Sequence, residues 1–327
     1  MATTPCRDSS LAQLAPLIGL REQELRRAVP HAAELLAAEL RSQYKSGLAG
    51  ILLYGSCLRG GTDESCLLDL LLLVDDYRSV YGSRKLALLN AALPPNVFYK
   101  ETHHGERTLR AKYAVVSTDQ FARYTSSRAF QSYFWARFAQ PCALVWARDE
   151  RVVRDIAQAL AVAVTTLLRR TLPLMPPTFD ASELWVRGLK ETYSTELRPE
   201  SSDTAARLVG DAPARYDTIT EMALPALPAL KAARTPRDAT KLSVNIAPAA
   251  RWRSRLAWRL RRLQGKLLNL ARLGKAAFTF HGGVDYLVWK VERHSGVRFE
   301  PTPRLRRHPL LFGWWVAWRL YRKGGFR

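Results

Sequence analysis

The sequence predicts an α/β (α+β) fold, in which a mixed sheet with helices precedes a mostly helical region and a basic C-terminal region. Three observations support this prediction: short apolar runs bounded by glycine, helical periodicity after residue 150, and a strong charge imbalance near the end. The chain has 327 residues, 47% of them hydrophobic, which is enough for more than one packed domain. We therefore predict three regions, 1–150, 151–248 and 249–327.

The first region is predicted from short apolar strands that alternate with helical stripes. A helix is expected over about 21–45, because Leu and Ala recur there at helical spacing. The run 67–74 contains one charge, Asp69, which suits a strand buried on both faces. The remaining expected elements are strands at 51–54, 97–99, 112–117 and 142–146, a hairpin through His103, His104 and Gly105, and a helix over 118–140.

The second region is predicted from helical periodicity and its punctuation. One helix is expected over 151–170, and Asp180 with Glu183 forms a capping-box pattern that begins another. The segment 225–248 is rich in Pro, Ala and Thr, which predicts a linker or irregular loop. A basic helix is then expected over 251–273.

The formal charge of +21 is concentrated at the end of the chain. Residues 251–327 contain 19 Lys and Arg against 3 acidic residues, a net charge of +16, which predicts an anionic partner such as a membrane or a nucleic acid. The Trp-rich segment 309–320 covers about 18 Å as a helix, too short for a hydrocarbon core of about 30 Å. With arginines on both sides it suits a helix at the headgroup level, and a helix docked on the protein core is the alternative.

The four cysteines predict no metal site. Cys6, Cys57, Cys66 and Cys142 include no C-x-x-C pair and no zinc spacing, so we expect free thiols in a reducing compartment. The N-terminus has no secretory signal pattern, and no run reaches the roughly 18–20 apolar residues of a membrane span.

A Gly-Ser turn followed by an acidic strand is the main indication of chemistry. Gly55 and Ser56 follow an apolar strand, and Asp69 lies near the head of the next one. Glycine allows close approach to phosphate oxygens, serine offers a hydroxyl, and a carboxylate is a hard ligand for Mg²⁺. This pattern is typical of nucleotidyl transfer, in which Mg²⁺ and fixed donors hold a triphosphate.

The second carboxylate that such sites usually carry two residues later is absent, because that position is Leu71. Asp75 lies on the same strand face as Asp69 but about 20 Å along the strand, too far to share one metal. Either a second ligand comes from elsewhere or the site is inactive. We interpret Asp75-Asp76 as a turn that ends the strand.

These residues resemble the mitochondrial phosphatidate cytidylyltransferases, also called translocator assembly and maintenance proteins, of the nucleotidyltransferase superfamily. The family pattern Y-G-S-G-V, then L-D-F and a hydrophobic run to V-D-D, is similar to 54–56 and 68–76. Other similar segments follow in the same order at 96–99, 111–117, 133–141, 179–198 and 274–279. The family also lacks a carboxylate where Leu71 stands, so the chain resembles a divergent member.

The resemblance implies that CTP and phosphatidic acid give CDP-diacylglycerol and pyrophosphate, with Mg²⁺ as cofactor. It implies a nucleotidyltransferase domain, a winged-helix-like domain and a membrane-associating C-terminus. Position by position, it assigns catalysis to Asp69 and Glu196, the metal to Asp69, and nucleotide or phosphate binding to Gly55, Ser56, Lys112, Arg198 and Lys275. At Cys57, Thr195 and Pro199 the chain departs from the family pattern. These departures put the identity of the substrate in question more than the type of reaction.

The expected partners are CTP, phosphatidic acid or a related anionic lipid, and an anionic membrane surface that the basic, Trp-rich C-terminal segment contacts. Nucleic acid is not expected. The expected location is the cytoplasm, peripheral on the inner face of a membrane, or the matrix side of the mitochondrial inner membrane in a eukaryote. Two other functions stay open: a nucleotidyltransferase with an RNA or protein hydroxyl as acceptor, and a non-catalytic protein of this fold that binds anionic membrane or nucleic acid. A solvated charge at Lys112 and a simple Glu196–Arg198 pair also stay open.

Overall fold

The computed structural model describes the chain except for residues 1–11, 59–65, 106, 197–201, 233–240 and 280–327. The contacts divide the chain into two compact units. We call Pro30–Val116 with Ala271–Arg327 the strand unit, and Met1–Val29 with Ser117–Leu270 the helical unit. The predicted mixed α/β fold is confirmed. The predicted regions 1–150, 151–248 and 249–327 stay a prediction.

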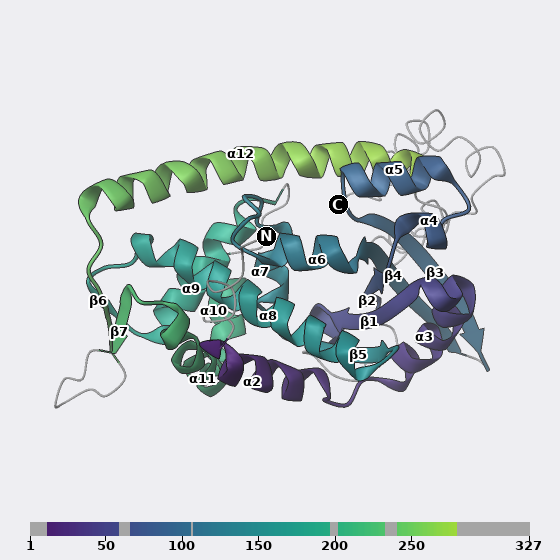
Figure 1. The fold of residues 1–327 in the computed structure, drawn as a ribbon, viewed down its shortest axis with the longest axis horizontal. Coiled ribbons are helices and arrows are strands. Elements are labelled where there is room, and N and C mark those ends of the chain that lie inside the picture. The colour runs from purple at the N-terminus through teal and green to yellow at the C-terminus, as the bar shows by residue number, and fades with distance from the viewer. Residues whose placement is uncertain (1–11, 59–65, 106, 197–201, 233–240, 280–327) are drawn as a thin grey trace, which may run out of the picture. The chain divides into compact units, whose positions relative to one another are not determined.

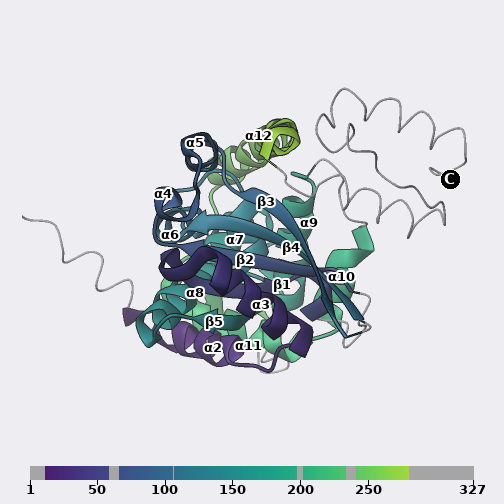
Figure 2. The ribbon, with the colours of Figure 1, turned by 90° about the vertical axis from the view of Figure 1, so that its right-hand side faces the viewer.

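The strand unit is organised around strands in the order β3-β4-β2-β1. Its elements are α3 (His31–Tyr44), η1 (Lys45–Gly47), β1 (Leu48–Tyr54), η2 (Ser56–Leu58), β2 (Leu68–Val74), α4 (Tyr77–Val80), α5 (Arg84–Ala92), β3 (Asn96–His104) and β4 (Arg107–Ser117). β1 pairs antiparallel with β2, and β3 pairs antiparallel with β4 in the predicted hairpin. Helix α3 packs on β1 (Figure 2).

The leucine-rich strand β2 is buried on both faces, as predicted. Every residue of β2 is buried except Asp69, which is partly exposed. At the end of β2 the Asp76 carboxylate accepts a hydrogen bond from the Arg78 backbone N–H at 2.9 Å and caps α4. This cap confirms that Asp75-Asp76 ends the strand, and it leaves Asp69 as the carboxylate that β2 itself presents.

The helical unit is organised around the long helix α8 (Glu150–Thr171). Its other elements are α2 (Ala15–Leu25), α6 (Thr118–Thr125), α7 (Tyr133–Phe138), β5 (Cys142–Ala147), η3 (Leu172–Leu174), β6 (Thr178–Phe179), α9 (Ala181–Tyr193), α10 (Ser202–Gly210), α11 (Pro213–Ala223), η4 (Leu224–Ala226), β7 (Leu230–Ala232) and β8 (Leu242–Val244). Helices α2, α6, α7 and α9 all pack on α8 (Figure 1). The Asp149 side chain caps α8 by accepting from the Val152 N–H, and the predicted helix is confirmed.

Three helices and three short strands lie together near the end of the helical unit, and the winged-helix-like domain that the resemblance implies stays a prediction. The chain order is β6, α9, α10, α11, β7, β8, and the strand order in the small sheet is β6-β8-β7. The predicted capping box begins α9: Asp180 accepts from the Glu183 N–H at 2.8 Å, and Glu183 accepts from the Asp180 N–H at 3.0 Å.

Two predicted helices are in fact each broken. The helix expected over 21–45 is wrong, because α2 ends at Leu25 and α3 begins at His31. Pro30 between them is extended, and a proline disfavours helix at the residue before it. The helix expected over 118–140 is also wrong. It is interrupted after Thr125, where the Ser126 hydroxyl donates to the Arg123 carbonyl and helps to end α6.

The Pro-rich segment 225–248 is not simply a linker, since it contributes β7 and β8 to the small sheet. Strands of three residues are too short for side-chain alternation to reveal them. The basic helix expected over 251–273 is confirmed and is longer: α12 is Pro248–Thr279. None of the helices in the described part of the chain combines the length and apolar character that a membrane crossing needs. The Trp-rich segment 309–320 lies outside the described residues.

Candidate functional site

The turn after β1 and the acidic residue of β2 lie against each other. Tyr54, the last residue of β1, stands opposite Asp69 in the antiparallel register, so Gly55 leaves the sheet directly beside the carboxylate. Gly55 has a φ of +89°, a conformation that side chains other than glycine's rarely adopt. A Cβ atom at Gly55 would lie 2.8 Å from Asp69 Oδ2. Both the backbone angle and the close contact therefore require glycine here.

We expect Gly55→Ala to lower the free energy of unfolding by about 1–3 kcal/mol and to weaken nucleotide binding, because the new methyl group displaces the Asp69 carboxylate. Thermal unfolding and calorimetry with a nucleotide would measure both effects. Gly105→Ala is the matched control, since Gly105 also has a positive φ, +61°, but open space around it. That control should lose stability and keep nucleotide binding. Unchanged binding in Gly55→Ala would contradict a binding role for this turn.

Lys112 brings a positive charge to the same carboxylate from a different strand. It lies on β4, next to β2 in the sheet, and its Nζ is 2.9 Å from Asp69 Oδ1. The Asp69 side chain is 23% exposed and that of Lys112 35% exposed, so both can meet a ligand from solvent. The structure thus joins three residues that are far apart in sequence: a glycine turn, a carboxylate and an ammonium group. Ser56, beside Gly55, is exposed.

The donors at this position fit Mg²⁺ only together with a substrate. Mg²⁺ is commonly held by one or two carboxylates, with phosphate oxygens and water filling its other positions. Asp69 supplies one such carboxylate. The described residues contain no group of three or more His, Cys, Asp or Glu that could hold a metal by themselves. A bound triphosphate would have to supply the remaining oxygens.

The prediction of four free thiols is wrong for two of them. Cys57 and Cys66 form a disulfide with their Cα atoms 6.1 Å apart, while Cys142 is a buried free thiol. The disulfide joins the residue just after Ser56 to the chain just before β2. This explains the cysteine at position 57, for which the sequence offered no reason. The sequence signal for this disulfide was weak. Two cysteines stand at the two ends of one loop, but their spacing matches no standard motif.

In the structure Glu196 pairs with Arg137, whereas the sequence analysis considered Arg198 as its partner. Glu196 follows α9 in the helical unit, and Arg137 donates to its carboxylate at 3.3 Å. Arg198 lies outside the described residues. The role of Glu196 as a second acidic group stays a prediction.

Lys275 is bound by backbone groups. Its ammonium donates to the carbonyl of Leu93 and to that of Pro95 at 2.9 Å, so within the strand unit it holds the last turns of α12 against the chain that follows α5. Burial lowers the pKa of Lys275 to about 8. These contacts give Lys275 a structural role, and its predicted phosphate-binding role stays a prediction.

No protein-family model matches the chain, and no curated protein matches it significantly. Among solved structures, the chain is similar to a nucleotidyltransferase-like protein from Exiguobacterium sibiricum 255-15. The two are 13% identical, the match covers 89% of this chain and 91% of the other, and the TM-score is 0.26. A TM-score of that size does not by itself establish a shared fold.

Proposed function

We propose that this protein is a Mg²⁺-dependent nucleotidyltransferase that transfers a cytidylyl group from CTP to phosphatidic acid or a related lipid phosphate. The observation that carries the proposal is the convergence of Gly55, Asp69 and Lys112 within the strand unit. Glycine turns, a carboxylate and a lysine are the groups that bind a triphosphate and its metal. The lipid acceptor is supported by the sequence resemblance and by the net charge of +16 at residues 251–327.

In this proposal the residues of the site change partners when the nucleotide binds. The turn at Gly55 and the Ser56 hydroxyl bind phosphate oxygens, and Lys112 exchanges Asp69 for a phosphate. Asp69 would hold Mg²⁺, and the bound ion would neutralise charge on the phosphates. An oxygen of the acceptor phosphate attacks the α-phosphorus of CTP. The new P–O bond forms as the bond to pyrophosphate breaks, so cytidylyl-lipid and pyrophosphate are the products.

The packing of helix α11 favours a lipid acceptor over a nucleic acid. In helix-turn-helix DNA-binding proteins, a recognition helix enters the major groove of the duplex. Helix α11, the third helix between β6 and β7, packs on α2 in the helical unit. Its Arg215 donates to Glu24 of the preceding chain at 3.1 Å, and its Tyr216 is buried against Trp185. One face of α11 is therefore committed to the protein's own core, and its exposed side chains include the carboxylates of Asp217 and Glu221, which would repel the phosphates of a nucleic acid.

We expect purified protein to release pyrophosphate from CTP only when Mg²⁺ and phosphatidic acid are both present. The lipid is supplied in detergent micelles, so that the assay does not depend on membrane binding, and the cytidylyl-lipid is identified by mass spectrometry. Chelation of Mg²⁺ should abolish turnover, and the other nucleoside triphosphates should compete poorly. Turnover with an RNA or protein hydroxyl and none with phosphatidic acid would overturn the lipid assignment. Absence of nucleotide binding would overturn the enzyme assignment.

A further inference from the structure

Helix α12 exposes its apolar side chains to solvent. Seven of the ten large hydrophobic residues that are exposed in the described chain lie on this helix. Six of them, which we call the leucine face, are Trp252, Leu256, Leu260, Leu263, Leu267 and Leu270, with exposures from 40% to 64%. They recur at steps of three and four residues, so they form one stripe about 27 Å long. An exposed apolar surface of this kind marks an interaction site.

The side of α12 opposite the leucine face packs on other elements of the helical unit. The leucine face therefore cannot turn inward. Trp258 is fully buried, stacks edge-on against Trp135 and donates to the Arg170 carbonyl at 3.0 Å. Gly265 lies so close to the chain that follows α9 that a Cβ atom there would be 2.5 Å from the Thr195 carbonyl oxygen. The close approach at Gly265 sets the rotation of the helix about its axis.

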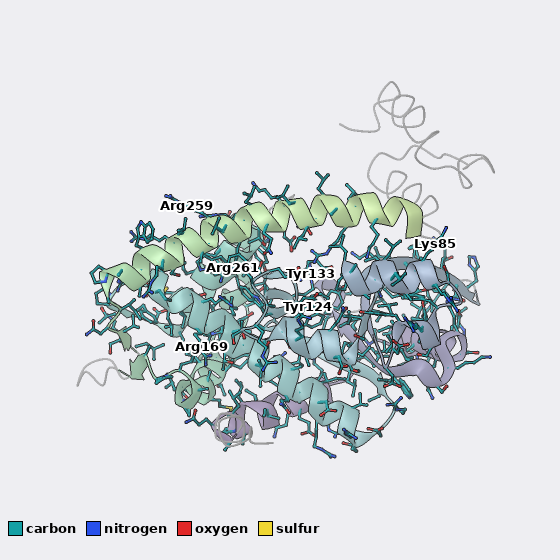
Figure 3. All side chains as sticks on the ribbon, turned by 45° about the horizontal axis from the view of Figure 1, so that its top comes forward. Lys85, Tyr124, Tyr133, Arg169, Arg259 and Arg261 are labelled. Carbon is teal, nitrogen blue, oxygen red and sulfur yellow. A yellow bond between two sulfur atoms is a disulfide. The ribbon has the colours of Figure 1, made fainter. Side chains whose placement is uncertain are left out.

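An arginine completes this inner side. Arg261 is 3% exposed, donates to the Phe130 carbonyl at 2.9 Å and lies over the rings of Phe130 and Trp258. Arg259 and Arg261 leave opposite sides of α12 (Figure 3). Helix α12 is therefore inverted relative to an ordinary surface helix, with an arginine inside and leucines outside.

The charges beside the leucine face are of one sign. The 32 residues of α12 contain nine Lys or Arg and no acidic residue. Arg253, Arg255, Arg259 and Lys266 are exposed next to the leucines. A second copy of the helix would bring basic residues against basic residues with no carboxylate to pair with, which disfavours a self-paired coiled coil. The complement of an apolar stripe with basic flanks is a surface that is apolar and anionic.

We propose that the leucine face of α12 lies on an anionic lipid bilayer, with Trp252 and the leucines among the acyl chains and the neighbouring basic residues at the headgroup phosphates. Interfacial helices bind membranes in this way, through buried apolar area and attraction to anionic lipid. This membrane contact involves α12 and not the turn at Gly55, and it does not depend on whether the acceptor is a lipid. Within the basic C-terminal region the membrane contact then lies on one face of α12, whereas the sequence pointed to the segment 309–320.

The experiment measures co-sedimentation of the full chain with vesicles, without nucleotide or Mg²⁺. We expect binding to vesicles of phosphatidylglycerol and phosphatidylcholine, weak binding to phosphatidylcholine alone, and loss of binding as salt rises. Leu263→Gln/Leu267→Gln should weaken binding by about tenfold or more. Glutamine is a good helix former, so both exposed positions should accept it without unfolding the helix. Leu88→Gln, which changes an equally exposed leucine on α5, is the control and should bind as the wild type does.

Three outcomes would overturn the proposal. If the wild-type protein does not bind anionic vesicles, an anionic bilayer is not the partner. If the double variant binds as tightly as the wild type, another segment is responsible for membrane binding. A wild-type dimer in light scattering that becomes monomeric in the double variant assigns the leucine face to a second copy. The result is separable from the proposed reaction, because the double variant should keep its activity on lipid in micelles and Asp69→Asn should keep vesicle binding.

Discussion

Asp69→Asn is expected to lower the rate of nucleotidyl transfer by about 10³-fold or more while leaving the fold intact. Asparagine has nearly the same shape, so the turn at Gly55 keeps its neighbour, but the amide oxygen is a much weaker ligand for Mg²⁺. Steady-state pyrophosphate release with CTP, Mg²⁺ and micellar phosphatidic acid would measure the loss. Thermal unfolding would check that the variant folds.

The nucleotide-binding behaviour of Asp69→Asn separates a catalytic role from a structural one. Lys112 loses the carboxylate that neutralises it, so nucleotide should bind at least as tightly without Mg²⁺ and should gain little when Mg²⁺ is added. A merely structural carboxylate would give weaker binding under both conditions. Asp75→Asn is the matched control, because Asp75 follows the same strand about 20 Å away and should keep activity within about twofold. Full activity in Asp69→Asn would overturn the proposed site.

Glu24→Gln is expected to destabilise the protein by about 3–5 kcal/mol, because it removes the carboxylate that pairs with two enclosed arginines. Arg21 is fully buried and donates to Glu24, and Arg215 donates to the same carboxylate through two nitrogens, one of them at 3.1 Å. The side chains of Glu24 and Arg215 are each 18% exposed. Chemical denaturation at pH 7 would measure the loss in the free energy of unfolding.

The pH dependence of stability offers a second readout for Glu24. Burial alone would raise the pKa of Glu24, but the attraction of Arg21 and the hydrogen bond from Arg215 outweigh burial, so the pKa lies below its usual value of 4.5. The folded state therefore holds this proton less tightly than the unfolded chain. The stability that Glu24 contributes is complete above about pH 4.5 and is lost as the pH falls through the lowered pKa. Glu24→Gln should remove this part of the acid dependence.

A neighbouring glutamate provides the control for this prediction. Glu22 lies on the same helix and pairs at 3.1 Å with Arg26, whose side chain is half exposed. Exposed pairs contribute about 0–1 kcal/mol, so Glu22→Gln should change stability little. Equal effects of the two substitutions would contradict the importance of burial for the Glu24 network.

Much of the strand unit could be predicted, because its signals are local. The leucine run of β2 is long enough to indicate burial on both faces, and Asp69 is conspicuous as its one charge. The capping box at Asp180 and the helix α8 were likewise readable from short patterns. The break at Pro30 also had a local signal, but the helical stripe that continues on both sides of it concealed the break.

The candidate site was predictable in part. The Gly-Ser turn and Asp69 came from spacing, whereas the contact of Lys112 with Asp69 depends on which strands are neighbours in the sheet. The disulfide between Cys57 and Cys66 depends on the register of β1 and β2, in which Tyr54 stands opposite Asp69, and sequence spacing does not report that register. The partner of Glu196 is Arg137, a residue 59 positions away that no local pattern could indicate.

Helix α12 separates what the sequence determines from what the tertiary structure decides. The sequence by itself determines that the segment is helical, basic and marked by leucines at helical spacing, because these follow from composition and the 3.6-residue period. It does not determine which side faces the protein. The tertiary structure decides this through Gly265, which lets the helix approach the Thr195 backbone, and through Trp258 and Arg261, whose polar groups find carbonyl partners inside. Once those contacts are made, the leucines have no position left except the surface.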